Sequence, residues 1–452
     1  MKKYALVGTG GRATMFLNAI AGVYRNQAQL VGLCDKSATR MRWHLNRLRT
    51  KFDCPDIPMY SAADFEGMIR QQHPDAVIVC SMDCTHHEYI VRAMELGCDV
   101  ISEKPMTTDA GKAKAILDAI ARTGRKLRVT FNYRYTPATT KVRELIMSGV
   151  IGRPLAVEMN WMLDTSHGAD YFRRWHREKD KSGGLLVHKA THHFDLINWW
   201  LDSRPEEVFA WGDLKFYGRK NAETRGESYS YDRYTGHPEA DGDPFALRLD
   251  RASPAQYVDE ETAKLLKGLY LDAEADSGYI RDRNVFGDNI SIEDSMSVLV
   301  RYRSGVTLTY SLIAYSPWEG FRISITGTKG RLELYEKHNS HIIAGQGDAE
   351  LAAMQERGQV KQLTLFPMFG LPRQIEIPEA VGGHGGGDPV MLEQIFSANP
   401  PSDPFKRAAS HLDGAASILI GISANESMRT GLPVKCDNLL SLPSDEQSNY
   451  EL

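Results

Sequence analysis

The sequence predicts an α/β protein in two parts: a doubly wound parallel sheet, then an α+β domain with an open, largely antiparallel sheet. Three observations predict this class. Short apolar runs alternate with helical segments up to Arg125. A glycine-rich loop directly follows the first apolar run. After Tyr135 the pattern changes to strands of alternating polarity with one major helical stretch.

The first domain is expected to span residues 1–135. Its strands are apolar throughout, as in a parallel sheet that is covered on both faces. The predicted strands are Tyr4–Val7, Gln29–Cys34, Asp75–Cys80, Asp99–Ser102 and Leu127–Phe131. Helices are predicted between them, among them Ala63–Gln72, His87–Leu96 and Asp109–Arg122.

The second domain is expected to span residues 136–430 and to begin with a helix at Thr136–Ser148. A helical stretch, Gly184–Leu201, and an amphipathic end, Pro404–Thr430, are predicted to pack on its sheet. Residues 218–290 and 338–372 interrupt the strand pattern and are interpreted as insertions. Residues 431–452 form a predicted tail. The predicted strands are Leu155–Met162, Glu207–Phe216, Met296–Tyr302, Val306–Ala314, Arg322–Thr326 and Arg331–Tyr335.

Composition narrows the classes of function. The 452 residues are 42% hydrophobic and 25% charged, as in ordinary globular proteins, and the formal net charge of −4 gives no basic field for nucleic acid. No stretch approaches the ~18 consecutive apolar residues of a membrane span. The six cysteines form no CxxC pair, and the first residues form neither a signal peptide nor a twin-arginine leader. A cytoplasmic location is therefore expected.

The first strand runs into Gly8-Thr9-Gly10-Gly11-Arg12-Ala13, which matches the GxGxxG/A fingerprint of a Rossmann dinucleotide site. Gly8 permits a tight turn, Gly10 and Gly11 let the backbone approach a pyrophosphate, and Ala13 permits close helix packing. Arg12 and the N–H groups of the following helix face the phosphates in this prediction.

Asp35 ends the second strand, where an acidic residue binds the ribose hydroxyls of NAD. Next to a 2′-phosphate, its charge would cost roughly 1–4 kcal/mol at ~4 Å. The sequence therefore predicts NAD as the cofactor, although Lys36 and Arg40 are close enough to offset part of this repulsion.

A second set of motifs comprises Ser81, His86, Glu103-Lys104-Pro105, Asn132-Tyr133-Arg134 and Gly183-Gly184. Together with the nucleotide loop, it resembles the glucose–fructose oxidoreductase / inositol dehydrogenase / MocA (Gfo/Idh/MocA) family of NAD(P)-dependent sugar enzymes over nearly the whole chain. The resemblance implies a bilobal fold whose open sheet often mediates oligomerisation, and a dimer or tetramer is expected.

The resemblance implies that Lys104 is the active-site lysine and that Ser81, His86, Glu103 and Asn132 lie beside the cofactor. The usual Thr-Pro-Asn is Ser81-Met82-Asp83 in this sequence. The family commonly has an Asp four residues before the histidine that corresponds to His192, and this chain has His188 instead.

Oxidation of a secondary alcohol needs a base for the hydroxyl proton and a positive group near the developing alkoxide. Lys104 is predicted to supply the charge, or the base if burial lowers its pKa, with His192 as acid/base partner. His188, His192 and Asp195 would share one face of a continuous helix. The HxxxH spacing also resembles a zinc pair but lacks the accompanying Glu and cysteines, so no metal is predicted.

Further residues are candidates for substrate binding because aromatic faces suit sugar rings and cations suit an anionic substituent. They are Tyr133, Arg134, Arg174, Trp175, Lys189, His193, and His384 and Asp388 of the glycine-rich segment 382–388.

Three functions remain open at this level. The first is an NAD-dependent oxidoreductase acting on a sugar or glycoside hydroxyl. The second is an NAD-dependent glycoside hydrolase that oxidises a hydroxyl transiently, eliminates the aglycone, adds water and returns the hydride; the extra titratable groups favour it, and an anionic, for example sulfonated, glycoside is one candidate substrate. The third is a non-catalytic NAD-bound sensor.

Overall fold

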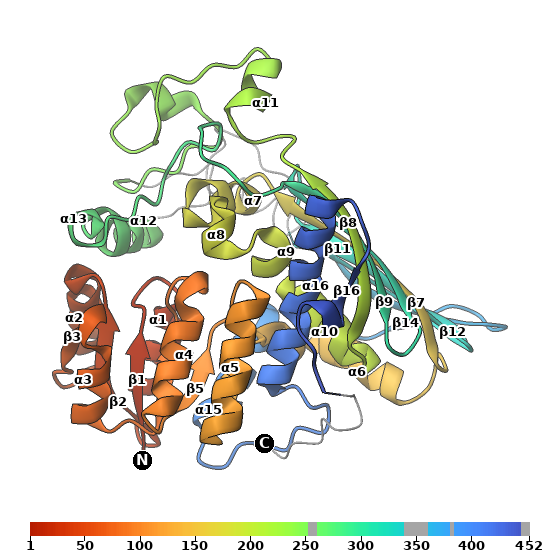
Figure 1. The fold of residues 1–452 in the computed structure, drawn as a ribbon, viewed down its shortest axis with the longest axis horizontal. Coiled ribbons are helices and arrows are strands. Elements are labelled where there is room, and N and C mark those ends of the chain that lie inside the picture. The colour runs from red at the N-terminus through yellow and green to blue at the C-terminus, as the bar shows by residue number, and fades with distance from the viewer. Residues whose placement is uncertain (252–259, 339–359, 380–383, 444–452) are drawn as a thin grey trace.

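The computed structural model describes residues 1–251, 260–338, 360–379 and 384–443 (Figure 1). The sheets and helices form two parts, a parallel sheet near the N-terminus and a larger sheet that follows it, as the sequence predicts. No helix in these ranges is long and apolar enough to cross a membrane.

The first sheet has the strand order β15-β6-β5-β4-β1-β2-β3, and all its pairs are parallel except that of β15 with β6. From β3 to β6 this is the 3-2-1-4-5-6 order of dinucleotide-binding domains. Its strands are β1 (Lys2–Val7), β2 (Ala28–Asp35), β3 (Met59–Ser61), β4 (Ala76–Val79), β5 (Asp99–Ser102), β6 (Leu127–Val129) and β15 (Ala409–Ser410). The helices between them are α1 (Ala13–Ala21), α2 (Ala38–Phe52), η1 (Ala62–Asp64), α3 (Phe65–Gln72), η2 (Asp83–Thr85), α4 (His86–Glu95) and α5 (Ala110–Thr123).

The second sheet has nine strands in the order β14-β13-β12-β11-β7-β10-β9-β8-β16, and β7 with β10 is its only parallel pair among the described strands. Buried and exposed residues alternate along β9 and β12, so one face is packed and the other is not. Its strands are β7 (Pro154–Asp164), β8 (Pro205–Asp213), β9 (Ser295–Tyr302), β10 (Thr307–Ser316), β11 (Gly320–Gly327), β12 (Gly330–Lys337), β13 (Val360–Pro367), β14 (Arg373–Ile375) and β16 (Val434–Lys435).

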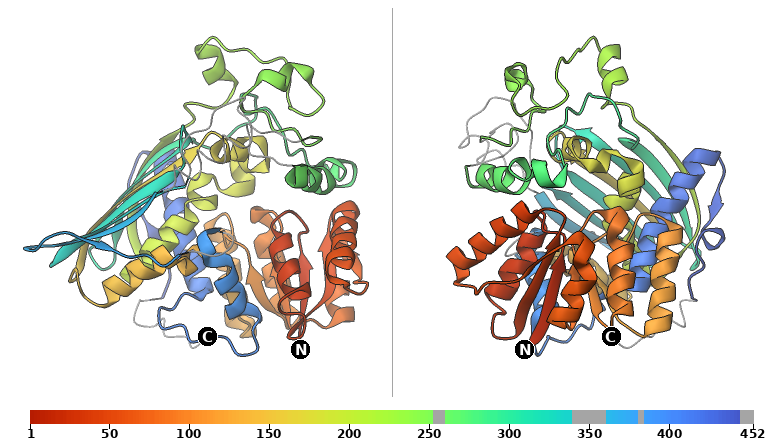
Figure 2. Two further views of the ribbon diagram at one scale, coloured as in Figure 1. Left: turned by 180° about the vertical axis from the view of Figure 1, so that it is seen from behind. Right: turned by 60° about the vertical axis from the view of Figure 1, so that its left-hand side comes forward.

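Helices cover one face of the second sheet and extend to the first domain (Figures 1 and 2). They are η3 (Asn132–Tyr135), α6 (Pro137–Met147), α7 (His167–Arg173), η4 (Trp175–Arg177), α8 (Lys179–Ser182), α9 (Leu185–His188), α10 (Thr191–Leu201), α16 (His411–Thr430) and η9 (Cys436–Asn438). Two more, η8 (His384–Gly386) and α15 (Gly387–Phe396), lie against η3, and α15 packs on α1 of the first domain. The 218–290 segment carries α11 (Arg219–Thr224), η5 (Pro238–Gly242), α12 (Glu260–Leu266), the π-helical turn η7 (Lys267–Leu271) and α13 (Glu274–Ser277).

Three predicted boundaries differ from the structure. Part of the predicted insertion 338–372 is strand β13, which pairs with β12 over its whole length. The predicted helix 184–201 is two helices, because the regular hydrogen-bond pattern is interrupted at Lys189 and Ala190. The Ala190 N–H bonds to the Leu185 carbonyl oxygen, five residues back, although both linking residues keep right-handed helical dihedral angles. The terminal helix begins at His411, where Ser410 caps it with a capping box, rather than at Pro404.

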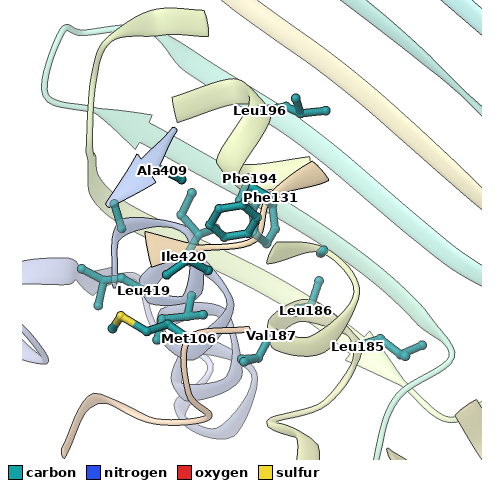
Figure 3. Close-up of a cluster of buried hydrophobic side chains, with 14 of the residues drawn as sticks. Met106, Phe131, Leu185, Leu186, Val187, Phe194, Leu196, Ala409, Leu419 and Ile420 are labelled. Carbon is teal, nitrogen blue, oxygen red and sulfur yellow. The ribbon is translucent and has the colours of Figure 1, made fainter. Parts of the chain in front are cut away.

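Apolar packing fixes the two short helices that follow Gly183-Gly184. Side chains of α9, α10 and α16 meet those of Met106 and Phe131 in one buried cluster (Figure 3). Gly421 of α16 allows the closest approach, because a Cβ there would lie 2.4 Å from the Leu186 carbonyl oxygen. The position of α9 therefore depends on α16.

Candidate active site

The glycine-rich loop has the geometry of a dinucleotide site. Gly8 has a φ of +88°, and a Cβ there would lie 2.4 Å from the Ser81 amide nitrogen, so only glycine fits. A Cβ on Gly10 or Gly11 would meet nothing within 4 Å except the Tyr270 hydroxyl. The loop thus leaves room for a phosphate at the start of α1, as the motif requires, although the Tyr270 hydroxyl accepts the hydrogen bond of the Gly11 N–H.

Asp35 lies where the sequence predicts, at the end of β2. Its Oδ2 accepts a hydrogen bond from the Thr9 hydroxyl at 2.8 Å, and its Oδ1 accepts one from the Ser37 N–H at 2.7 Å. The buried Asp35 carboxylate therefore holds the nucleotide loop, and its contact with a ribose stays a prediction.

A polar network joins the nucleotide loop to the segment after β5. Arg12 Nε donates to Glu103 at 2.7 Å, and Arg12 Nη1 lies 3.7 Å from Asp388. Asn132 Nδ2 donates to Asp388 Oδ1 at 2.7 Å, while the buried Asn132 Oδ1 has no hydrogen-bond partner among the described residues. Asp388, predicted to bind substrate, thus holds two residues predicted to bind the cofactor.

His86 has two backbone partners. Its Nδ1 lies 2.8 Å from the Pro105 carbonyl oxygen and its Nε2 lies 3.0 Å from the Ser81 carbonyl oxygen. Both ring nitrogens are used, and the ring is buried. His86 therefore connects the loops that carry Ser81 and Lys104, and its place beside the cofactor stays a prediction.

Lys104 is half-buried between the two domains. Its Nζ donates to the His188 carbonyl oxygen at 3.3 Å. Desolvation lowers the pKa of Lys104 to about 8, with a further lowering from the charge of Lys189 and an opposing effect of Asp83. The amine is therefore largely charged at neutral pH and becomes largely neutral just above pH 8, so it can act as either cation or base.

Asp83 and His188 form a hydrogen-bonded pair beside Lys104. His188 Nδ1 contacts the Asp83 carboxylate, and the other ring nitrogen of His188 has no hydrogen-bond partner among the described residues. Burial raises the pKa of Asp83 and lowers that of His188. A neutral His188 that donates to Asp83 through Nδ1 keeps Nε2 as a proton acceptor.

His176 completes this cluster. Its ring meets the His188 ring edge to face at 4.1 Å and stacks on Trp175 at 3.6 Å. Ligand atoms of Asp83, His176 and His188 lie within 4.8 Å of one another, a spacing that a divalent cation could use. The charges of Lys104 and Arg174 act on Asp83 and would repel such a cation, so we interpret the cluster as an acid–base group.

His192 lies on α10 in an aromatic stack rather than on the Asp83–His188 pair. Its ring stacks on Tyr133 at 4.6 Å, and Tyr133 lies in turn over Trp161. The described contacts of Lys104 are with His188 and not with His192. The expectation that His188, His192 and Asp195 share one helical face is wrong, because a break separates α9 from α10.

Lys189 is a buried cation in the same region. Its Nζ lies 4.9 Å from the Trp161 ring centre and 5.8 Å from that of Tyr133. Desolvation lowers its pKa, and the charge of Glu319 opposes this. No described carboxylate forms an ion pair with Lys189, so its ammonium is held mainly by aromatic faces.

Two predicted substrate residues have structural partners. Arg134 is 1% exposed and donates two hydrogen bonds to Asp195, at 2.6 and 2.8 Å. His193 is fully buried, and its Nδ1 lies 2.8 Å from the Tyr310 hydroxyl. Arg134 and His193 Nδ1 are thus held by protein groups, and a contact of either residue with substrate stays a prediction.

Of the other predicted substrate residues, Trp175 and Arg174 are both half-buried but differ in their partners. Trp175 is half-buried beside His176 and His188, as expected of a sugar-stacking ring. Arg174 is also half-buried and is ion-paired with Asp170 at 3.0 Å. The side chain of His384 lies outside the described residues.

Sequence reasoning missed Asp83 and His176 as members of the cluster. Asp83 had a signal, because it replaces the Asn of the expected Thr-Pro-Asn, and the same chain replaces the expected Asp by His188. The two changes are complementary, since they bring a carboxylate and an imidazole together from different domains. His176 directly follows Trp175, a predicted substrate residue, but the sequence does not show that η4 lies beside α9, so the contact of His176 with His188 could not be predicted.

A dinucleotide loop next to a half-buried lysine and an acid–base cluster defines the class: an NAD(P)-dependent oxidoreductase with a Rossmann domain. Comparison with known proteins agrees. Residues 2–131 match the oxidoreductase-family model for an NAD-binding Rossmann fold, and residues 143–436 match the model for the C-terminal alpha/beta domain of the same family. The chain belongs to the Gfo/Idh/MocA oxidoreductase family.

Individual relatives agree with this assignment. The chain is 35% identical over 452 residues to the protein YteT of Bacillus subtilis (strain 168), covering 98% of this chain and 99% of the relative. An aldose-aldose oxidoreductase from Caulobacter crescentus, solved with glycerol, superposes with a TM-score of 0.59 at 16% identity, covering 96% and 99%. The WlbA dehydrogenase from Bordetella pertussis, solved with NADH and UDP-GlcNAcA, gives 0.60 at 16% identity, covering 98% and 99%. These two structures show a shared fold.

Proposed function

We propose that this enzyme uses NAD to oxidise a hydroxyl of a sugar or glycoside. The observation that carries the proposal is the meeting of Lys104, from the first domain, with the Asp83–His188 pair at the carboxyl ends of the parallel strands. Ligands of open α/β sheets bind at this edge. Bound NAD would supply the hydride acceptor, held by the glycine loop and Asp35.

The protein's own residues then handle the proton. Neutral Lys104, or His188 Nε2 with Asp83 orienting the ring, accepts the hydroxyl proton as the C–H hydride leaves. The ammonium form of Lys104 stabilises an alkoxide in the reverse direction. Trp175, which stacks on His176 with one face, offers its other face to a sugar, and His192 is held on Tyr133 as a second acid/base group.

A second candidate, an NAD-dependent glycoside hydrolase, is favoured by the number of titratable groups. A single oxidation needs one acid/base group, yet Asp83, His176, His188 and Lys189 gather around Lys104. Hydrolysis needs more of them: after oxidation a base removes the acidified neighbouring C–H proton, an acid protonates the departing aglycone, and water adds before the hydride returns. Lys189 would suit an anionic substituent on such a glycoside.

Product analysis with a panel of neutral and anionic glycosides tests both candidates. NADH formed in proportion to ketone identifies the dehydrogenase. Free sugar released with catalytic NAD and no net NADH identifies the hydrolase. Lys104→Ala should abolish either reaction while NAD still binds. NAD binding without turnover of any substrate by the unaltered protein would instead support the sensor, and full activity of the Lys104→Ala variant would overturn the role of Lys104.

We also infer a homo-oligomer, a dimer or tetramer, that forms through the open face of the second sheet. Trp211 of β8 is 68% exposed and Leu299 of β9 is 50% exposed, and Leu299 pairs directly with Phe209. Adjacent exposed apolar side chains on a sheet favour association. Light scattering after size-exclusion chromatography tests this, and a Trp211→Glu variant should shift the mass to that of a monomer.

All six cysteines are free thiols, which supports the proposed cytoplasmic setting.

A further inference from the structure

The 218–290 insertion contacts the nucleotide half of the first domain. Its last helical part, η7 and α13, lies against α2 in Figures 1 and 2. The Gly11 N–H donates to the Tyr270 hydroxyl at 3.0 Å, so this segment reaches the phosphate loop itself. A segment of the second domain therefore borders the adenosine side of the cofactor site.

Asp276 of this segment binds the start of α2. The Ser37 hydroxyl donates to Asp276 Oδ1 at 2.7 Å, and the Thr39 N–H donates to Asp276 Oδ2 at 2.9 Å. Ser37 is the N-cap of the fifteen-residue helix α2 and directly follows the turn after Asp35. The carboxylate of Asp276 thus occupies donors that an anion would otherwise use at this helix terminus.

These same donors are the ones that an adenosine 2′-phosphate needs, because a Rossmann domain recognises the 2′-position just after the second strand. Arg40 would be the neutralising cation, but its Nε donates to the Leu269 carbonyl oxygen at 2.8 Å. Its guanidinium also lies 5.4 Å from the ring centres of Tyr270 and Tyr279. The insertion thus draws Arg40 toward itself and brings a carboxylate to the place of a phosphate.

We propose that Asp276 is a specificity-determining residue that makes the enzyme select NAD over NADP, acting together with Asp35. Asp35 alone is partly committed to Thr9 and Ser37, so a second acid beside the ribose adds to the discrimination. An NADP 2′-phosphate would have to displace the Asp276 carboxylate from Ser37 and Thr39, or bind beside it with like-charge repulsion. This inference rests on the NAD dependence proposed above.

The test compares NAD+ and NADP+ binding by isothermal titration calorimetry on the full-length protein. We expect the unaltered protein to bind NAD+ at least ~10-fold more tightly than NADP+. Asp276→Asn, which removes the charge but keeps an acceptor oxygen, should raise NADP+ affinity ~10-fold and change NAD+ affinity less than about threefold. Asp272→Asn is the matched control, because Asp272 lies on the same segment and pairs with Lys267 at 2.6 Å instead of α2. It should leave both affinities unchanged.

The outcomes separate this inference from the proposed function. An unchanged NADP+ to NAD+ affinity ratio in Asp276→Asn overturns the role of Asp276 and leaves NAD dependence standing. A preference of the unaltered protein for NADP+, or binding of neither nucleotide, overturns the proposed NAD dependence and this inference with it. A second measurement needs no variant: adenosine 2′,5′-bisphosphate should bind the unaltered protein at least ~10-fold more weakly than 5′-AMP. Equal affinities would contradict the proposal.

Discussion

At the scale of single residues, burial of Lys104 determines whether its amine is a base or a cation near neutral pH. Desolvation lowers its pKa to about 8, so the amine is largely neutral above that pH and largely charged below it. A base must be neutral to accept the hydroxyl proton. We therefore expect kcat/KM for oxidation to rise with pH to a plateau, with an inflection at about 8. Steady-state kinetics in overlapping buffers measures this, and a flat profile between pH 7 and 9 would argue against Lys104 as the base.

Asp83 should act through His188 rather than on the substrate. Asp83→Asn keeps the size of the side chain but removes the acceptor charge that fixes the His188 tautomer, so kcat should fall by roughly 10²-fold or more. Asp180→Asn is the control, because Asp180 is an exposed carboxylate on the nearby helix α8. Equal activities of the two variants would remove Asp83 from the site.

The cluster of Asp83, His176 and His188 allows a test of metal dependence. Because Lys104 and Arg174 place positive charge next to Asp83, we expect dialysis against EDTA to leave activity unchanged. The measurement is the rate before and after dialysis, with metal content determined in parallel. Activity that is lost with EDTA and restored by a divalent cation would reassign Asp83, His176 and His188 as metal ligands.

Prediction from sequence works well for single residues whose position depends only on the neighbouring chain. The requirement for Gly8 and the position of Asp35 follow from a strand, a tight turn and a helix in sequence order. It fails where partners come from distant segments. Arg134 follows a strand in a motif that suggests substrate binding, but its partner Asp195 lies 61 residues further on. Nothing near either residue indicates that pairing.

At the scale of elements, the break between α9 and α10 shapes the site. Hydrophobic periodicity continues from Leu185 to Leu201 because both helices are buried, so the pattern predicts one helix. The break turns His188 toward Lys104 while α10 carries His192 onto Tyr133. A fully buried segment has no solvent-exposed stripe whose shift along the chain would reveal such an interruption.

Packing of α16 holds α9 in this position. Gly421→Ala would place a methyl group 2.4 Å from the Leu186 carbonyl oxygen, and we expect the free energy of unfolding to fall by roughly 1–3 kcal/mol. Gly242→Ala is the control, since a Cβ there meets nothing within 4 Å; its effect should stay within about 0.5 kcal/mol. Urea denaturation measures both. Similar values for the two variants would show that α16 can move away without cost.

At the scale of the whole molecule, the two domains are joined by more than one chain crossing. β15, from the segment before α16, adds an antiparallel strand to the edge of the first sheet beside β6. Next to it, Arg134 of η3 binds Asp195 of α10 and lies 3.0 Å from Asp413 of α16. The sequence predicts the fold of both parts but not this junction, because Asp413 lies 279 residues after Arg134 and Asp195 lies 61 residues after it.

Arg134 should therefore stabilise the whole molecule. Arg134→Ala would leave Asp195, which is 1% exposed, as an unpaired buried carboxylate, and breaking a buried pair in this way costs roughly 3–5 kcal/mol. Arg429→Ala removes an exposed i,i+3 pair with Glu426 and should cost less than about 1 kcal/mol. Urea unfolding followed by both tryptophan fluorescence and far-UV circular dichroism distinguishes two results. If Arg134 joins the domains, its loss lowers one common midpoint that both probes report. If it matters only within the second domain, the circular dichroism curve, which sums the helices and strands of both domains, splits into two steps and the later step keeps the original midpoint.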